Sequence, residues 1–251
     1  MYMRSLIKRV GGKSKLSKYI NSKIPVHKIY IEPFVGGGAV FFEKGESEVE
    51  VVNDLDTDIY NIYKDMKAVG DQMINKDFQA NRDKFNRFKN QKTFNSKTER
   101  LYRNLYLSFN SYRGDRKNFI GEKEIAYRGD GNIGRKYKST DYKDRLKNVI
   151  IKNNDWKTIV KKYDSKDSFF YLDPPYSMAK DNNDYTNNDV TIDELYNTLK
   201  NIKGKFLLSY DFNPDIKKKF SGFNKKIVNT QYETSGSGDK IDKKEYLISN
   251  F

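Results

Sequence analysis

The chain has 251 residues, of which 36% are hydrophobic and 33% are charged, so it can bury one sizeable domain, with or without a large insertion, and is not wholly disordered. It has no cysteine, which excludes disulfides and thiolate sites. It has a single histidine, His27, which disfavours Ser-His-Asp catalysis and multi-histidine zinc sites, and we expect no metal. The N-terminus lacks an apolar signal-peptide core and no segment approaches a membrane span, so a soluble, cytoplasmic protein with no membrane partner is expected.

The net charge is +14 and the pI is near 9.5, which favours a polyanionic partner. The basic excess is concentrated in one segment. Residues 76–148 hold 20 basic and 9 acidic side chains, which is +11 of the +14, and the flanks are nearly neutral. A bias in base composition would have spread the charge evenly, so this segment is predicted to contact nucleic acid.

The first flank predicts the beginning of a parallel α/β sheet. Residues 28–34 form a short apolar run that ends at a glycine cluster, and residues 39–43 resume an apolar pattern compatible with a helix. Residues 48–53 alternate as in a strand, and apolar residues recur at helical spacing over 57–69. The order strand, turn, helix, strand, helix is typical of a parallel sheet.

The second flank repeats this alternation after a different middle segment. Residues 76–107 have a helical pattern, and residues 108–147, rich in Gly, Tyr, Arg and Asn, predict loops with a hairpin. Further strands are expected at 149–152, 168–172 and 205–210, helices at 156–163 and 192–200, and a final antiparallel pair of strands at 225–228 and 245–248. We therefore predict a catalytic domain made of residues 1–75 and 149–251, interrupted by a target-recognition insertion, 76–148.

The glycine turn after the first strand is typical of nucleoside binding. Gly36 and Gly38 lie between a predicted strand and helix, where backbone can approach a ligand and helical N–H groups can point at it. Asp54 follows the next strand, about twenty residues further on, as a carboxylate that accepts hydrogen bonds from ribose hydroxyls would. An ordinary tight turn has the same form, and both NAD and S-adenosylmethionine remain open as ligands.

A second glycine pair near the N-terminus resembles the end of a phosphate-binding P-loop. That loop needs a glycine where Ile7 stands, which excludes nucleotide hydrolysis. Lys13, directly after the pair, is instead a candidate for holding an anionic group of a ligand beside the glycine turn.

The string Asp173-Pro174-Pro175-Tyr176 directly follows a predicted strand and indicates methylation of an exocyclic base amine. Two prolines stiffen a turn at the carboxyl end of the sheet, where sites of α/β proteins lie. The amine nitrogen is a poor nucleophile because its lone pair is delocalised into the ring. The Asp173 carboxylate and the Pro174 carbonyl can each accept one amine hydrogen and direct the lone pair at a methyl donor, while Tyr176 stacks on the extracted base.

Together these strings resemble the Dam-like DNA adenine methyltransferases, especially the phage-type members. In chain order they are RVGGKSKL, YIEPFVGGGAVFF, VVNDLD, the basic insertion, NNDW, FFYLDPPY, FLLSYD and EYLISNF, which cover nearly the whole chain. The cofactor turn precedes the catalytic loop, as in the alpha arrangement of that family. The resemblance implies a Rossmann-like fold, S-adenosylmethionine as cofactor and double-stranded DNA as partner. One departure is Arg9-Val10, where Dam usually has an aromatic residue and an alanine.

The resemblance also implies roles for individual residues. The methionine part of the cofactor is expected at Lys13, Phe34, Gly36 and Gly38, its ribose at Asp54, and its adenine at Asp155 and Trp156. The catalytic loop would be Asp173, Pro174, Pro175 and Tyr176, and Tyr185 belongs to a short motif that closes over the base.

The DNA contacts are expected in the insertion. Arginine can read guanine through two hydrogen bonds, while lysine and further arginines neutralise phosphates. The candidates are Arg113, Arg116, Arg128, Arg135 and Lys136, which lie among tyrosines and glycines.

We therefore predict an α/β, Rossmann-like, S-adenosylmethionine-dependent DNA adenine methyltransferase with a mainly helical, basic recognition insertion. A restriction-modification role and a phage or mobile-element source are expected, with host-defence evasion and regulation as alternative roles. The same chemistry on the cytosine N4 amine or on an RNA adenine is the closest rival. A non-enzymatic DNA-binding protein would have eroded the Asp173 loop or the glycine turn, and a nicotinamide dehydrogenase has no use for that loop.

Overall fold

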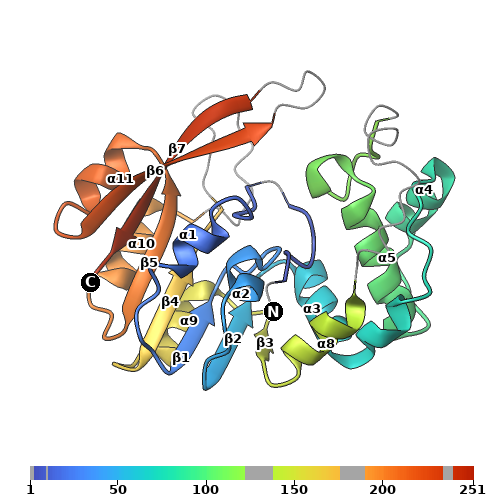
Figure 1. Ribbon diagram of the computed structural model, residues 1–251, viewed down its shortest axis with the longest axis horizontal. Coiled ribbons are helices and arrows are strands. Elements are labelled where there is room, and N and C mark those ends of the chain that lie inside the picture. The colour runs from blue at the N-terminus through green and yellow to red at the C-terminus, as the bar shows by residue number, and fades with distance from the viewer. Residues whose placement is uncertain (1–2, 10, 122–137, 176–189, 234–239) are drawn as a thin grey trace. The chain divides into compact units, whose positions relative to one another are not determined.

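A computed structural model describes residues 3–9, 11–121, 138–175, 190–233 and 240–251 (Figure 1). By their spatial contacts the residues group into two compact units. The first unit comprises residues 1–21, 36–45 and 54–153, and the second comprises residues 22–35, 46–53 and 154–251. Among the residues described, no helix is both long and apolar enough to cross a membrane.

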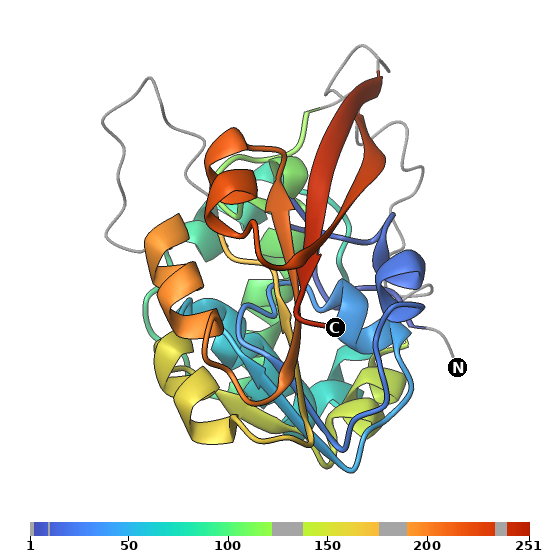
Figure 2. The ribbon, with the colours of Figure 1, turned by 90° about the vertical axis from the view of Figure 1, so that its left-hand side faces the viewer.

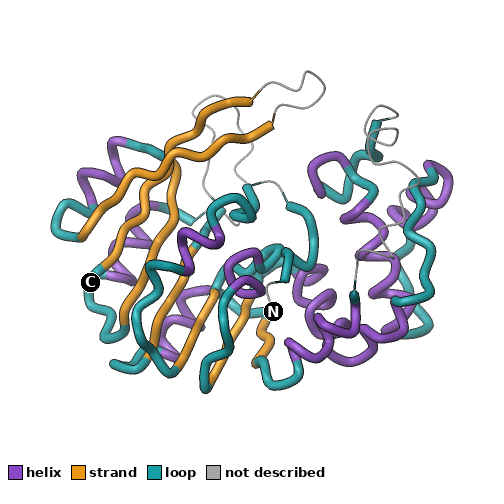
Figure 3. The backbone as a smooth tube through the Cα atoms, in the orientation of Figure 1, coloured by secondary structure: helices purple, strands orange, loops and turns teal. Residues whose placement is uncertain are grey.

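A mixed sheet forms the centre of the second unit (Figure 3). Its strands there are β1 (Ile29–Glu32), β2 (Val49–Asn53), β4 (Ser168–Leu172), β5 (Lys205–Asp211), β6 (Asn224–Glu233) and β7 (Lys240–Ser249). Within the unit they follow the order β2-β1-β4-β5-β7-β6, in which β2, β1, β4 and β5 are parallel and the β6–β7 hairpin is antiparallel. The predicted parallel sheet with a final antiparallel pair is confirmed, and its hairpin strands are longer than expected.

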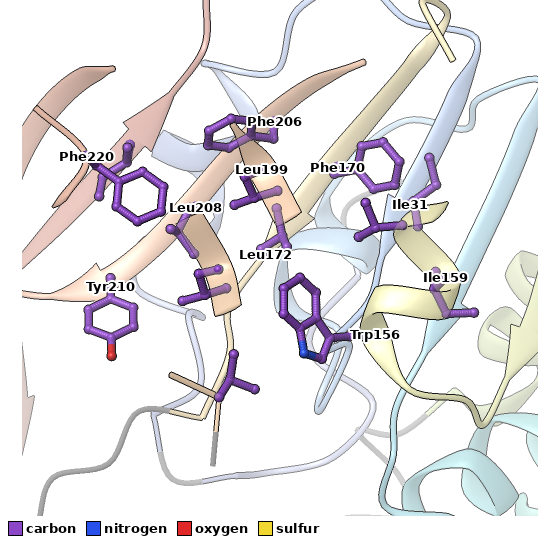
Figure 4. Packing of buried hydrophobic residues seen from close by; sticks show 14 of the residues in the cluster. Ile31, Trp156, Ile159, Phe170, Leu172, Leu199, Phe206, Leu208, Tyr210 and Phe220 are labelled. Carbon is purple, nitrogen blue, oxygen red and sulfur yellow. The ribbon is translucent and has the colours of Figure 1, made fainter. Parts of the chain in front are cut away.

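Three helices of the second unit cover one face of this sheet (Figure 2). They are α9 (Trp156–Tyr163), α10 (Ile192–Leu199) and α11 (Pro214–Lys219). Each begins at a side chain that caps its N-terminal N–H groups: Asp155, then Thr191 in a capping box with Glu194, then Asn213. Their apolar faces are buried against Ile31, Phe170, Leu208 and other alternate residues of the strands (Figure 4).

The other face of the same strands carries buried polar groups. Tyr30 donates a hydrogen bond of 2.7 Å to Glu32 Oε2, and the Tyr171 and Ser209 hydroxyls are 3.0 Å apart. A strand alternates its side chains between the two faces, so an apolar face toward the helices leaves these residues on the opposite one.

The first unit is mainly helical in the residues that are described. Its elements are α1 (Ser17–Asn21), α2 (Ala39–Glu43), α3 (Thr57–Val69), the 3-10 helix η1 (Gly70–Met73), α4 (Arg82–Asn90), α5 (Lys97–Phe109), the 3-10 helix η2 (Tyr112–Gly114), α8 (Ser139–Leu146) and the strand β3 (Ile150–Lys152). On α5, Arg100 donates two hydrogen bonds, of 2.7 and 2.8 Å, to the fully buried carboxylate of Asp65 on α3. A buried carboxylate needs such a partner, so this pair joins the two helices.

The insertion departs from the predicted pattern in two places. The expected helix over 76–107 is divided into α4 and α5, because Asn81 and Ser96 each cap a new helix with a side-chain oxygen. Within 108–147, which predicted loops, residues 139–146 form α8. This helix buries few apolar side chains, Tyr142 and Leu146 among them, and so left little periodic signal. The expected hairpin there is limited to a bridge between Ser111 and Phe119 in the described residues.

Candidate active site

In the first unit, the glycine turn and Asp54 are joined by hydrogen bonds. The Gly36 N–H donates to Asp54 Oδ2 at 2.9 Å, and the Asp56 N–H donates to Asp54 Oδ1, also at 2.9 Å. Each carboxylate oxygen therefore accepts one backbone donor and keeps capacity for one more. This arrangement holds the acceptor in a defined orientation, as recognition of two neighbouring hydroxyls requires.

The turn itself needs glycine for two different reasons. Gly36 and Gly38 have φ angles of +48° and +70°, in the left-handed region that side chains rarely adopt. A Cβ atom at Gly38 would also lie 2.4 Å from the Tyr63 hydroxyl and 2.9 Å from the Phe42 ring. Tyr63 in turn donates a 3.2 Å hydrogen bond to the Gly36 carbonyl, so helix α3 supports the turn.

The electrostatics of Asp54 combine burial with a nearby cation. Burial raises the pKa of the Asp54 carboxyl above its usual range, and the charge of Arg9 acts against that rise, as do the hydrogen bonds from Asp56 and Gly36. Arg9 Nη1 lies 3.5 Å from Asp54 Oδ2. The cation therefore helps to keep a buried carboxylate ionised and able to accept.

Lys13 lies in the same unit and is buried, with 4% of the residue exposed. Its Nζ donates to the Gly11 carbonyl at 3.1 Å. The lysine is thus tied to its own loop, and its predicted role beside the cofactor stays a prediction.

In the second unit, two predicted aromatic residues come together. The rings of Phe34, after β1, and Trp156, at the beginning of α9, have centroids 5.6 Å apart at 41°. Asp155 caps α9 by accepting from the N–H groups of Lys157 and Thr158, both through Oδ1. The acid and the aromatic pair therefore lie at one helix N-terminus, where Trp156 is buried in the hydrophobic core and Phe34 is partly buried against that core.

Asn53, at the end of β2, was not foreseen as a site residue. Its buried side chain donates to the carbonyls of Pro33 and Asn154 and accepts from the Asn154 N–H, each at 2.9 Å. It thereby fixes the loop that carries Phe34 against the loop that carries Asp155. The asparagines in VVNDLD and NNDW were the only signal, since asparagine often bonds to loop backbone.

Asp173 and Pro174 lie at the carboxyl end of β4, directly after five buried residues. Parallel pairing of β4 with β1 brings this end beside the end of β1. Asp173 is half-buried and Pro174 is buried, while Pro175 is exposed. Burial, and after it the charge of Asp173, raises the pKa of Tyr171 well above its usual range, so the Tyr171 hydroxyl stays neutral.

Of the remaining predicted site residues, the structure describes only some. Tyr176 and Tyr185 of the catalytic region lie outside the described residues, as do Arg128, Arg135 and Lys136 of the insertion, and the side chain of Arg113 is not described either. Arg116 is described, and its guanidinium contacts Asp56 and Asp58 instead of facing solvent. Its predicted DNA contact stays a prediction.

Each group, taken by itself, offers donors and acceptors that suit one part of S-adenosylmethionine. An ionised acceptor with two backbone-held oxygens suits a ribose diol, an aromatic pair beside an acid suits an adenine ring, and a glycine turn without side chains allows close approach. Among the described residues, no cluster of His, Asp and Glu is arranged to hold a metal ion.

Comparison with known proteins gives concordant matches. Residues 10–234 match the D12 class N6 adenine-specific DNA methyltransferase family. The Type II methyltransferase M.MjaIII of Methanocaldococcus jannaschii is 30% identical over 293 residues, covering 100% of both chains. The DNA adenine methylase of Serratia marcescens is 26% identical over 186 residues, which is 69% of this chain and 67% of the relative. The DNA N-6-adenine-methyltransferase of Escherichia phage P1 is 40% identical over 73 residues, 29% of this chain and 10% of the relative.

Proposed function

The chain belongs to the D12 class N6 adenine-specific DNA methyltransferases and methylates adenine in DNA; we propose that S-adenosylmethionine is its methyl donor and that its substrate is an adenine extracted from duplex DNA. Membership of this family confirms the predicted adenine acceptor and the enzymatic role. The cytosine amine, a non-enzymatic DNA-binding protein and a dehydrogenase are thereby set aside.

The observation that carries the proposal is the Asp173-Pro174 turn at the end of buried β4. The Asp173 carboxylate and the Pro174 carbonyl each accept one hydrogen of the N6 amine, which orients the nitrogen lone pair and raises its nucleophilicity. When bound, S-adenosylmethionine supplies an electrophilic methyl group on a sulfonium. The new N–C bond forms as the methyl–sulfur bond breaks, and the electron pair of the broken bond remains on sulfur as a neutral thioether. Positive charge develops on the amine meanwhile, the negative charge of Asp173 stabilises it, and the amine then releases one proton to water. Tyr176 and Tyr185 are proposed to stack on and enclose the base.

Two groups of residues are proposed to hold the cofactor, one in each unit. In the first unit, Asp54 accepts from the ribose hydroxyls, and Gly36, Gly38 and Lys13 line the methionine part. In the second unit, Asp155 and Trp156 hold the adenine, and Phe34, which the resemblance assigns to the methionine part, contacts the Trp156 ring. The backbone donors on both Asp54 oxygens support the ribose assignment, and the ring contact of Phe34 with Trp156 supports an aromatic site for the adenine.

The basic segment 76–148 is proposed to bind the duplex as the target-recognition insertion. Its +11 charge supports phosphate contacts, and the candidates for contacts with bases and phosphates are Arg113, Arg116, Arg128, Arg135 and Lys136. Full-length similarity to a Type II methyltransferase supports a modification role at one target site, and the phage P1 relative supports a phage or mobile-element source. The protein is proposed to act on DNA in the cytoplasm.

One experiment tests donor, substrate and site together. Duplex DNA, its separated strands and RNA of the same sequence are incubated with S-adenosylmethionine labelled in the methyl group, and modified bases in the DNA are mapped by single-molecule sequencing. We expect label in 6-methyladenine of the duplex at one recurring sequence, and none with the Asp173→Ala variant. Preferred labelling of RNA or of single strands would contradict the duplex assignment.

A further inference from the structure

Six charged side chains of the first unit gather at the N-terminus of α3. Three are carboxylates and three are guanidiniums: Asp54, Asp56, Asp58, Arg9, Arg103 and Arg116. Only Asp54 has a proposed role in cofactor binding so far.

Arg116 makes the closest contacts in this cluster. Its Nη2 lies 2.5 Å from Asp56 Oδ2 and its Nη1 lies 3.4 Å from Asp58 Oδ2. The side chain is 19% exposed. Its Nη2 is hydrogen-bonded to one carboxylate, and its Nη1 is buried beside another without a hydrogen bond of its own among the described residues, so the guanidinium is not presented for a two-bond contact with guanine.

The backbone of Arg116 is held in an unfavourable conformation to make these contacts. Its φ of +60° is the one positive value among the described residues other than glycine. Such a conformation persists only where the surroundings enforce it, and it concentrates at functional sites. Here the Arg116 N–H donates to the buried Ser111 Oγ at 2.9 Å, and Gly114 packs so closely on Lys8 that a Cβ would lie 2.2 Å from its carbonyl oxygen.

A short series of bonds leads from Arg116 to the ribose acceptor. Asp56 caps α3 through Oδ1, which accepts from the N–H groups of Asp58 and Ile59, and it binds Arg116 through Oδ2. The N–H of Asp56 donates to Asp54 Oδ1. Arg116 therefore holds the residue whose backbone orients the Asp54 carboxylate.

We propose that Arg116, although it lies in the basic insertion, is a positioning residue for the cofactor: by binding Asp56 and Asp58 it fixes the loop that presents Asp54 to the ribose. This inference rests on the proposed function, because it requires Asp54 to be the ribose acceptor. It also moves Arg116 out of the group of DNA-reading candidates.

The test uses Arg116→Gly, since glycine accepts the +60° φ and the variant loses only the guanidinium and the strain. We expect an unchanged or higher melting temperature together with S-adenosylmethionine binding weakened about 5- to 20-fold in calorimetry without DNA. The turnover at saturating cofactor and the salt dependence of DNA binding should change little. Arg116→Lys should restore part of the affinity. Arg87→Gln is the matched control, because it removes an exposed charge from the same insertion.

A double mutant separates positioning from general damage. If Arg116 acts through Asp54, then Arg116→Gly should add almost nothing to the loss of affinity in an Asp54→Ala background. Full additivity would overturn the inference. So would a cofactor affinity within twofold of the parent, or a DNA salt slope lowered by about one, as for a lost phosphate contact.

The same variants distinguish failure of this inference from failure of the proposed ribose site. Weakened binding in Asp54→Ala with normal binding in Arg116→Gly would overturn this inference and leave the proposed function intact. Normal binding in Asp54→Ala would overturn the proposed ribose site, and the inference with it.

Discussion

Asp54→Asn is the substitution for which the structure gives the sharpest expectation. The carboxylate accepts one backbone N–H on each oxygen, from Gly36 and from Asp56. An amide of the same shape has only one accepting oxygen, so its NH2 group must face a second N–H donor, and the negative charge is lost. Losing a charged hydrogen-bond partner typically costs about 1.5–3 kcal/mol. We therefore expect S-adenosylmethionine to bind about 10- to 150-fold more weakly.

Asp164→Asn provides the matched control. Asp164 also accepts backbone N–H groups through both oxygens, from Lys203 and Gly204, but it does so before the amino end of β5. Calorimetric titration with S-adenosylmethionine should therefore show normal affinity for Asp164→Asn and weak affinity for Asp54→Asn, with thermal melting confirming that both fold. Equal cofactor affinities in the two folded variants would refute the assignment of Asp54.

Three further outcomes are expected. Asp173→Ala should lower single-turnover methylation of a duplex oligonucleotide by about 10²–10³-fold or more, with cofactor affinity nearly unchanged; near-normal turnover would remove this residue from the mechanism. Cofactor affinity should fall on acidification as Asp54, whose pKa is raised, takes up a proton, and Arg9→Gln should move this loss to higher pH because the opposing cation is gone; titrations at several pH values measure it. Because the pKa of Asp54 is raised in the folded protein, this carboxyl stabilises the fold at low pH, and that stabilisation is lost as the pH rises through the pKa. Unfolding caused by Asp54 therefore does not explain a loss of cofactor affinity in acid. Lys117→Gln, at an exposed site of the insertion, should lower the slope of log K for DNA against log salt by about 0.9, and Lys166→Gln in the second unit should not; equal slopes for all three proteins would contradict the insertion as the phosphate-binding segment.

The sequence by itself determined most elements of the two flanks and the class of reaction. Helix α3 is found at its predicted bounds, Thr57–Val69, because an N-cap and apolar residues at helical spacing act within a few turns of chain. Strand β4 is found at 168–172 for a similar local reason, a buried apolar run stopped by two prolines. The motifs that follow such strands could be recognised from sequence because a glycine turn, a carboxylate and a pair of prolines seldom occur in this order at strand ends without a function.

Only the tertiary structure decided which distant groups meet. Asn53 bonds to Asn154, 101 positions away, and Arg116 binds Asp56, 60 positions away. Helix α8 likewise depends on a few buried contacts instead of its own periodicity. Local propensity acts over a few residues, whereas the partner of a charge or an amide depends on which surfaces packing brings together, and a single sequence does not encode that choice in any local pattern.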